Sequence, residues 1–169
     1  MSPALGQASS EVMYMMWTQK EASLLEDLKA QEKLCIEKYG KYAQQAKDPQ
    51  LKQLFSQIQQ TEQQHEQTVT QMLNGTIPQM PQQGGGQQQN QQMGQLPAYG
   101  QQPSPDKQDD AYLCQDALSM EKHVSGVYNM SVFEFRAPQA RDVLSHLQKE
   151  EQQHGEMLYG YMARNGMQA

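Results

Sequence analysis

The chain has 169 residues, a formal net charge of −6 and a mean hydropathy of −0.87. This length fits one domain. The charge argues against a nucleic-acid partner, because no basic stripe is available to displace counterions. No segment is long and apolar enough to cross a bilayer, and residues 13–17 are too short and lack the basic lead-in of a signal peptide. We therefore expect no membrane partner and synthesis in the cytoplasm.

Residues 1–17 show no clear period and are expected to form a flexible N-terminal arm. Thr18 and Glu21 have the spacing of a capping box, which predicts that a helix begins there. Pro49 ends this helix and can open the next, since proline suits a first helical position. The predicted apolar face of the first helix contains Leu25, Leu28, Glu32, Cys35, Tyr39 and Tyr42. That of the second contains Leu51, Leu54, Phe55, Ile58, Glu62, His65, Val69, Met72 and Leu73.

Residues 18–75 thus form a first predicted helical hairpin, and residues 76–105 change character completely. They are rich in Gln, Gly, Pro and Asn, and such a segment cannot bury enough apolar surface to offset its entropy, so we expect a disordered linker. Residues 106–165 form a second hairpin with a stop at Pro138. Its apolar faces contain Cys114, Ala117, Glu121, Val124, Tyr128, Val132 and Phe135, then Val143, Leu144, Leu147, Glu151, His154, Leu158, Tyr161 and Met162. Cys35 and Cys114 share no CxxC spacing and are expected to be reduced core residues.

The second hairpin repeats the first at a constant offset of 89 residues. The longest identical run is Glu-Gln-Gln-His, at residues 62–65 and again at 151–154. Two hairpins together can close a core that neither closes alone. A linker of this length can run along a whole bundle at roughly 3.3 Å per residue. The sequence therefore predicts an all-α, ferritin-like four-helix bundle that is a single domain, with residues 76–105 as the long crossover.

Two acidic side chains of each hairpin replace core residues on the apolar faces. Glu32 lies about as far before the Pro49 turn as Glu62 lies after it, so both are expected at one height in the bundle. His65 follows Glu62 by one helical turn on the same face. A buried carboxylate needs a partner or a metal, and the repeat doubles this set. We therefore predict a site for two metal ions, Fe or Mn. Its predicted ligands are Glu32, Glu62, His65, Glu121, Glu151 and His154.

Other tyrosines, histidines and glutamates are not predicted to be metal ligands. Tyr39 and Tyr128 lie two turns from the glutamates of their own helices; each either donates a hydrogen bond to a ligand or metal-bound oxygen, or only fills the core. His123 and His146 have no repeat partner and are expected at the surface or, at most, behind the ligands. Four glutamates off the stripes are interpreted as solvated surface charges: Glu26, Glu37, Glu66 and Glu150.

Two segments and the Glu-Gln-Gln-His run resemble the coat F family of spore coat proteins. The segments are residues 24–39 (LLEDLKAQEKLCIEKY) and 47–55 (KDPQLKQLF), and the resemblance extends over 18–75 and 106–165. It implies a spore-associated helical protein of the ferritin-like superfamily, with the coat as its location. The order and spacing of Glu32, Tyr39 and Glu62-x-x-His65 are also similar to the first half of ferritin and bacterioferritin di-iron sites.

Two functions follow as alternatives. In the first, the chain is a coat protein whose Gln-rich linker favours self-association or binding to other coat proteins. In the second, the dimetal centre acts on peroxide or oxygen as a catalase-like enzyme or oxidase. The chain lacks the CxxC iron module with which rubrerythrins supply electrons, so a self-contained peroxidase is not expected. A storage role is the least favoured, because nothing indicates cage-forming surfaces.

Overall fold

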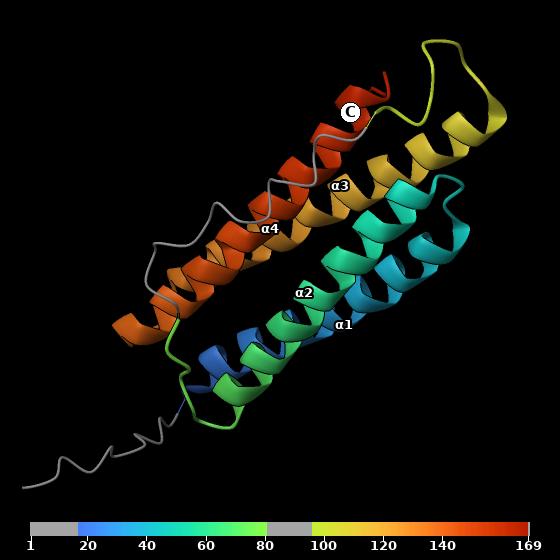
Figure 1. Cartoon of the computed structure of the whole chain (residues 1–169). Helices are drawn as coiled ribbons and strands as arrows, with labels where there is room; N and C mark the ends of the chain where they lie inside the picture. The colour runs from blue at the N-terminus through green and yellow to red at the C-terminus, as the bar shows by residue number, and fades with distance from the viewer. Residues whose placement is uncertain (1–16, 81–95, 169) are drawn as a thin grey trace, which may run out of the picture.

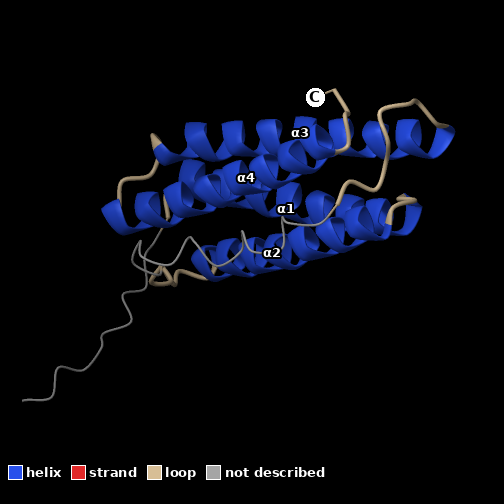
Figure 2. Cartoon of the chain, turned by 45° about the horizontal axis from the view of Figure 1, so that its top comes forward, coloured by secondary structure: helices blue, strands red, loops and turns tan. Residues whose placement is uncertain are grey.

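The computed structural model describes residues 17–80 and 96–168, which contain four helices and no strand. The helices are α1 (Gln19–Gln45), α2 (Pro49–Leu73), α3 (Pro105–Val132) and α4 (Pro138–Arg164). They lie side by side as an elongated bundle (Figures 1 and 2). The predicted all-α four-helix bundle is confirmed. The N-terminal arm, apart from Trp17, lies outside the described residues.

Local sequence signals account for the helix ends. The Thr18 hydroxyl accepts from the Glu21 amide, and the Glu21 carboxylate accepts from the Thr18 amide, which is the predicted capping box. Asp48 caps α2 ahead of Pro49, and Ser104 caps α3 through the amide of Lys107. The last turns of α2 and α4 are followed by glycines with positive φ, at Gly75 (86°) and Gly166 (61°).

Contacts at the two ends of the bundle define how the helices run. Arg136, in the turn between α3 and α4, bonds Glu21 at the start of α1. At the other end Tyr161 of α4 donates to Asp48, in the turn between α1 and α2, over 2.6 Å. Neighbouring helices are α1 and α2, α3 and α4, α1 and α3, and α2 and α4, and each of these pairs is therefore antiparallel. It follows that α2 and α3 run in the same direction, so the chain between them must cross the length of the bundle.

The side chains expected on the apolar faces form the core. In α1 all six predicted residues are buried, together with Glu21. In α2 the buried set is the predicted one except that Leu54 and Leu73 are only half-buried. Tyr39, Tyr128, Tyr161 and Phe55 are the largest fully buried side chains. Cys35 and Cys114 are free and buried, as expected. The core therefore runs along the whole bundle and includes four buried glutamates, Glu32, Glu62, Glu121 and Glu151.

Part of the predicted linker is held against the bundle. The amides of Ala98 and Tyr99 donate to the Asn165 side chain at 2.9 and 3.1 Å, and the Tyr99 hydroxyl donates to Asp110 at 2.7 Å. The expectation of disorder is therefore wrong for residues 96–104, because two backbone amides and the Tyr99 hydroxyl find partners on the bundle. Residues 81–95, which contain most of the glutamines of the predicted linker, lie outside the described residues.

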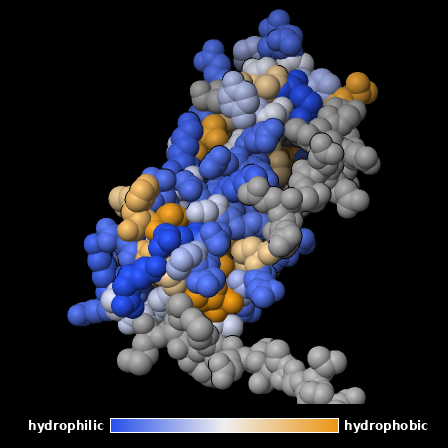
Figure 3. Space-filling view, turned by 90° about the vertical axis from the view of Figure 1, so that its left-hand side faces the viewer, coloured by the Kyte–Doolittle hydropathy of each residue, from blue (hydrophilic) through white to orange (hydrophobic). Residues whose placement is uncertain are grey.

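Polar side chains cover most of the face shown in Figure 3. Large exposed hydrophobic side chains among the described residues are spread over several elements, at Leu34, Leu96, Tyr112, Met130, Phe133 and Tyr159. No helix of the described parts combines the length and apolar character that a membrane crossing needs.

Candidate metal centre

The six predicted ligands meet in one buried layer between the two hairpins. α1 and α3 each contribute one glutamate, whereas α2 and α4 each contribute a Glu-x-x-His pair. Every one of the six is at most 3 % exposed. Four helices thus bring four carboxylates and two imidazoles together in a part of the core from which water is largely excluded.

The six residues form two overlapping groups, each of which can hold a metal ion. The first contains Glu32, Glu62, His65 and Glu151, and the second contains Glu62, Glu121, Glu151 and His154. Within each group, one ligand atom per residue lies within 4.8 Å of all the others. The two imidazole rings are stacked with their centroids 5.6 Å apart. Three carboxylates and one imidazole per position is a donor set suited to Fe or Mn.

Glu62 and Glu151 belong to both groups because each directs one oxygen to each histidine. The Nδ1 atom of His65 lies 3.1 Å from Glu62 Oε2 and 3.0 Å from Glu151 Oε1. The Nδ1 atom of His154 lies 3.3 Å from Glu62 Oε1 and 3.5 Å from Glu151 Oε2. Two shared carboxylates between two positions is the arrangement in which carboxylates bridge a pair of metal ions.

Glu32 and Glu121 each approach only one histidine. Glu32 Oε1 is 3.8 Å from Nδ1 of His65, and Glu121 Oε2 is 3.5 Å from Nδ1 of His154. They occupy the positions at which a carboxylate would serve one ion alone. All six residues therefore divide into two shared and four unshared donors.

The layer leaves several buried polar atoms without a hydrogen bond. Among the described residues these atoms are Glu32 Oε2, Glu62 Oε1 and Oε2, Glu121 Oε2, Glu151 Oε2 and His154 Nδ1. All of them belong to the six predicted ligands. A buried polar atom without a partner costs roughly 1–3 kcal/mol, and more when it is charged. A pair of cations would satisfy these atoms, so the donor set fits the group that the sequence predicts.

The four carboxyl groups differ in pKa. Burial, reinforced by the charges of Glu151 and Glu62, raises the pKa of Glu32 well above its usual value. Burial also raises the pKa of Glu121, to about 8. For Glu62 and Glu151 burial acts in the same direction, but the adjacent imidazoles outweigh it and lower the pKa of both. At neutral pH Glu121 thus favours its protonated form, the upward shift acts in the same sense on Glu32, and the two shared carboxyls are ionised.

The surroundings of both histidines favour the charged, imidazolium form. Burial works to lower the pKa of His65 and of His154, but the surrounding carboxylates more than offset it and raise both values well above the usual one. The metal-free layer therefore balances negative shared carboxylates with imidazolium ions. A bound metal ion would take over this role from the Nδ1 protons.

Tyr39 and Tyr128 donate hydrogen bonds to the two unshared glutamates. The Tyr39 hydroxyl donates to Glu121, and the Tyr128 hydroxyl donates to Glu32. Each tyrosine therefore contacts a glutamate of the other hairpin, a partner that the spacing along the chain did not specify. Both hydroxyls thus contact predicted ligands, and both tyrosines are at the same time fully buried in the core.

Glu150 is the main correction to the residues singled out from the sequence. It was interpreted as a solvated surface charge, yet its side chain is only 31 % exposed and its Oε2 atom lies 2.9 Å from Nε2 of His65. Its Oε1 atom lies 3.5 Å from Nε2 of His146. The interpretation was wrong because Glu150 lies on the edge of α4 that faces α2. His123, Glu26 and Glu37 are exposed as expected.

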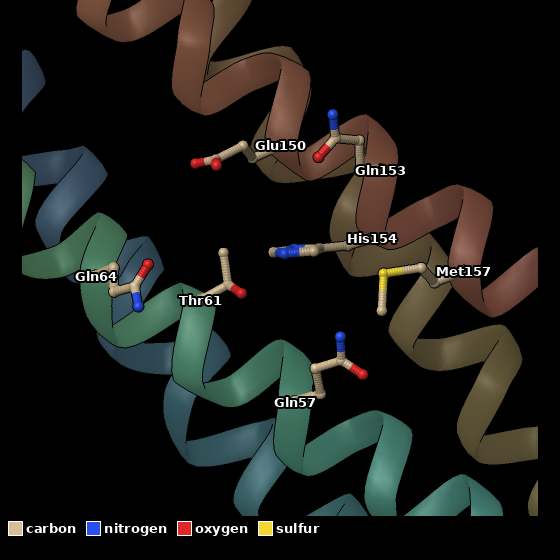
Figure 4. Close-up of a pocket in the computed structure, with 7 residues that line it drawn as sticks. All are labelled: Gln57, Thr61, Gln64, Glu150, Gln153, His154 and Met157. Atoms are coloured by element: carbon tan, nitrogen blue, oxygen red, sulfur yellow. The ribbon is translucent and has the colours of Figure 1, made fainter. Parts of the chain in front are cut away.

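A small cavity of about 70 Å³ opens between α2 and α4 beside the layer. Glu150, Gln153, His154 and Met157 line it from α4, and Gln57, Thr61 and Gln64 line it from α2 (Figure 4). His154 points into the space between the two helices, so the cavity connects the edge of the acidic layer with the surface.

Comparison with known proteins bears on the second half of the chain. Residues 109–169 match the family model described as the Coat F domain. This match covers α4 and most of α3. No curated protein and no solved structure matches the chain. The match supports the predicted resemblance to the coat F family. It lies in the hairpin that contributes Glu121, Glu151 and His154 to the acidic layer.

Proposed function

We propose that this chain is a ferritin-like protein of the spore coat whose bundle core binds two Fe or Mn ions. The observation that carries the metal part is the pair of overlapping groups that share Glu62 and Glu151. Glu32 and His65 would hold one ion, Glu121 and His154 the other, and the two shared carboxylates both. Such a pair of ions can exchange electrons with oxygen or peroxide.

The path of the chain supports the ferritin-like assignment. In that architecture two antiparallel hairpins are joined by one long crossover, and the metal ligands are a Glu from each of two helices and a Glu-x-x-His from each of the other two. Here α1 and α3 supply the single glutamates, and α2 and α4 supply the Glu-x-x-His pairs. The 89-residue repeat accounts for the similarity of the two halves.

The Coat F match supports the coat part of the proposal. The Gln-rich segment between α2 and α3 suits self-association or binding to other coat proteins, since Gln- and Asn-rich chains pair readily with one another. A bundle with a metal-stabilised core is a durable unit for such a layer.

Elemental analysis tests the metal part directly. Protein purified without chelator is expected to contain close to two Fe or Mn ions per chain, and removal of the metal is expected to lower the unfolding temperature. A protein that contains neither metal, and whose unfolding temperature does not change when Fe²⁺ or Mn²⁺ is added, would refute the proposal.

A second function is favoured by the cavity beside His154. Its volume of about 70 Å³ admits a molecule the size of peroxide or oxygen close to the acidic layer. The same centre would then act as a catalase-like enzyme or an oxidase. Metal-loaded protein should in that case decompose hydrogen peroxide or consume oxygen, and Thr61→Trp, which fills the cavity, should slow the reaction without removing metal. Equal rates in the two proteins would exclude this route.

A further inference from the structure

The Nε2 atoms of His65 and His154, which point away from the shared carboxylates, have different surroundings. Nε2 of His65 lies 2.9 Å from Glu150 Oε2. His154 has no corresponding contact within the described part of the chain, since its close polar neighbours all approach Nδ1. The two halves of the layer, alike in their six donors, therefore differ immediately behind the imidazoles.

The repeat explains this difference at the residue level. Glu150 directly precedes Glu151, and the corresponding residue before Glu62 is Thr61. His146, which contacts the other oxygen of Glu150, corresponds to Gln57. In place of a carboxylate, the cavity of Figure 4 lies beside His154.

A partner on Nε2 controls what Nδ1 can do. When Nε2–H donates to a carboxylate, the neutral imidazole keeps its lone pair on Nδ1, and the ring is held in one orientation. In this structure Nδ1 of His65 is the atom that faces Glu62 and Glu151. The contact with Glu150 thus prepares His65 for a cation at Nδ1, whereas no such carboxylate contacts Nε2 of His154 among the described residues.

We infer that Glu150 is a positioning residue that makes the two metal positions unequal, so that the position at His65 binds its ion more tightly than the position at His154. This inference rests on the proposed two-metal function. Carboxylates behind a histidine ligand typically contribute 10–100-fold to metal affinity. We expect a difference of about that size between the two positions.

Calorimetric titration of the metal-free full chain with Mn²⁺ tests the inference. The wild type is expected to show two classes of site, one ion each, separated by roughly 10–100-fold in affinity. Glu121→Ala removes the carboxylate that belongs only to the His154 position, and should abolish binding at the lower-affinity class of site. This variant assigns the classes to the two histidines.

Variants at the two corresponding residues then measure the effect of Glu150. Glu150→Thr copies the other half and should weaken only the tighter class, by about 10–100-fold, until the classes coincide. Glu150→Gln retains an oxygen acceptor without the charge and should lose less, since charge-assisted hydrogen bonds are about twice as strong as neutral ones. Thr61→Glu should conversely tighten the weaker class. Glu156→Gln, an exposed charge change on the same helix, serves as the control and should change neither.

The outcomes separate the inference from the proposed function. If Mn²⁺ does not bind at all, the two-metal function is wrong. If two Mn²⁺ ions bind with one affinity in the wild type, or Glu150→Thr and Glu150→Gln weaken both classes equally, the positioning role of Glu150 is wrong while the metal site remains. Should Glu150→Thr not fold, Glu150→Gln and Thr61→Glu still decide, because an unchanged affinity in both overturns the inference.

Discussion

Tyr39 and Tyr128 tie each half of the acidic layer to the opposite hairpin. A fully buried phenol needs an acceptor, and each of these hydroxyls finds it in an unshared glutamate from across the bundle. The hydrogen bond holds one carboxylate oxygen, Oε1, of each glutamate. In Glu32 and in Glu121 the other oxygen, Oε2, is without a partner in the metal-free protein.

Removing one tyrosine hydroxyl should therefore affect one metal position more than the other. Tyr128→Phe is expected to weaken the position of Glu32 and His65 by roughly 10-fold, because the carboxylate loses the group that orients it. Tyr39→Phe should do the same for the position of Glu121 and His154. Mn²⁺ titration measures both. If each variant instead weakened the position of its own hairpin, the crossed assignment would be wrong.

Metal binding should release protons at neutral pH. The pKa of Glu121 is about 8, so this carboxyl favours its protonated form at pH 7, and the pKa values of Glu32 and both histidines are shifted upward as well, which also favours their protonated forms. A metal ligand must be deprotonated. Titrations in two buffers of different ionisation enthalpy count the protons, and we expect more than one per chain at pH 7. The number should fall as the pH rises through 8; a number that stays at zero would contradict these pKa shifts.

The spacing of residues predicted which six side chains converge in the acidic layer, but not which residues lie behind them. Glutamates on an apolar face are costly unless paired, and this made Glu32 and Glu62 visible in the sequence. Glu150 lay off the apolar face, and only the packing of α4 against α2 brings it to His65. The tyrosines were visible as buried residues, but which glutamate each contacts depends on how the hairpins face one another.

At the scale of helices, the two ends of the bundle are closed by buried acidic residues. Glu21 is 1 % exposed and accepts hydrogen bonds from the backbone and guanidinium of Arg136 and from Thr18. Asp110 accepts from the amides of Lys47 and Asp48 at 2.8 and 2.9 Å. Each carboxylate thus joins one hairpin to the turn of the other.

Glu21→Gln should destabilise the protein in a pH-dependent manner. Burial opposes ionisation, but the bonds from Arg136 and Thr18 prevail and lower the pKa of Glu21 to about 2. A depressed pKa stabilises the fold above the unfolded-state value near 4.5 and loses that contribution as the pH falls toward 2. Urea unfolding at pH 7 should show a loss of about 2–3 kcal/mol in the variant, and a smaller loss at pH 3.

Glu134→Gln provides the matched control at the same end of the bundle. Glu134 pairs with Lys20 at 2.6 Å, but both side chains are largely exposed, and an exposed pair contributes little. We expect a much smaller effect than for Glu21. Equal losses in the two variants, or a loss in Glu21→Gln that does not depend on pH, would contradict the role given to Glu21.

Asp110→Ala should lower the free energy of unfolding by about 3 kcal/mol. The change leaves the Lys47 and Asp48 amides and the Tyr99 hydroxyl without their acceptor, and each unsatisfied buried group costs roughly 1–3 kcal/mol. Asp109→Ala, an exposed neighbour on the same helix, should be nearly neutral. Denaturation of the two variants compares them, and similar midpoints would show that Asp110 does not hold the end of the bundle.

The sequence predicted most of the helix boundaries, but it did not predict the contacts at the ends of the bundle. Thr18, Pro49 and Pro138 marked helix starts because caps and prolines act locally. The hydrogen bonds that the amides of Ala98 and Tyr99 donate to Asn165 join residues 67 and 66 positions apart in the chain, and no local sequence pattern indicates them. Composition alone therefore overstated the disorder of the segment before α3.

At the scale of the whole molecule, the acidic layer lies where the two hairpins meet. The rest of the core consists mainly of buried apolar side chains, whereas in the layer itself buried carboxylates face one another across the bundle. Several of these carboxylate oxygens lack a hydrogen bond, which costs stability, and bound cations would satisfy them and join all four helices. A ligand that binds only the folded chain at 100 times its dissociation constant adds about 2.7 kcal/mol of stability. We expect a corresponding rise in unfolding temperature with Fe²⁺ or Mn²⁺.

The central claim is that the four-helix layer holds two metal ions through Glu62 and Glu151, and native mass spectrometry of the metal-treated full chain tests it most directly. The wild type and a control with Glu26→Ala and Glu156→Ala, two exposed positions, should each retain two ions. The variant with Glu62→Ala and Glu151→Ala should retain none, because both positions lose two of their four donors. A wild type without metal, or a double variant that still holds two ions, would contradict the account.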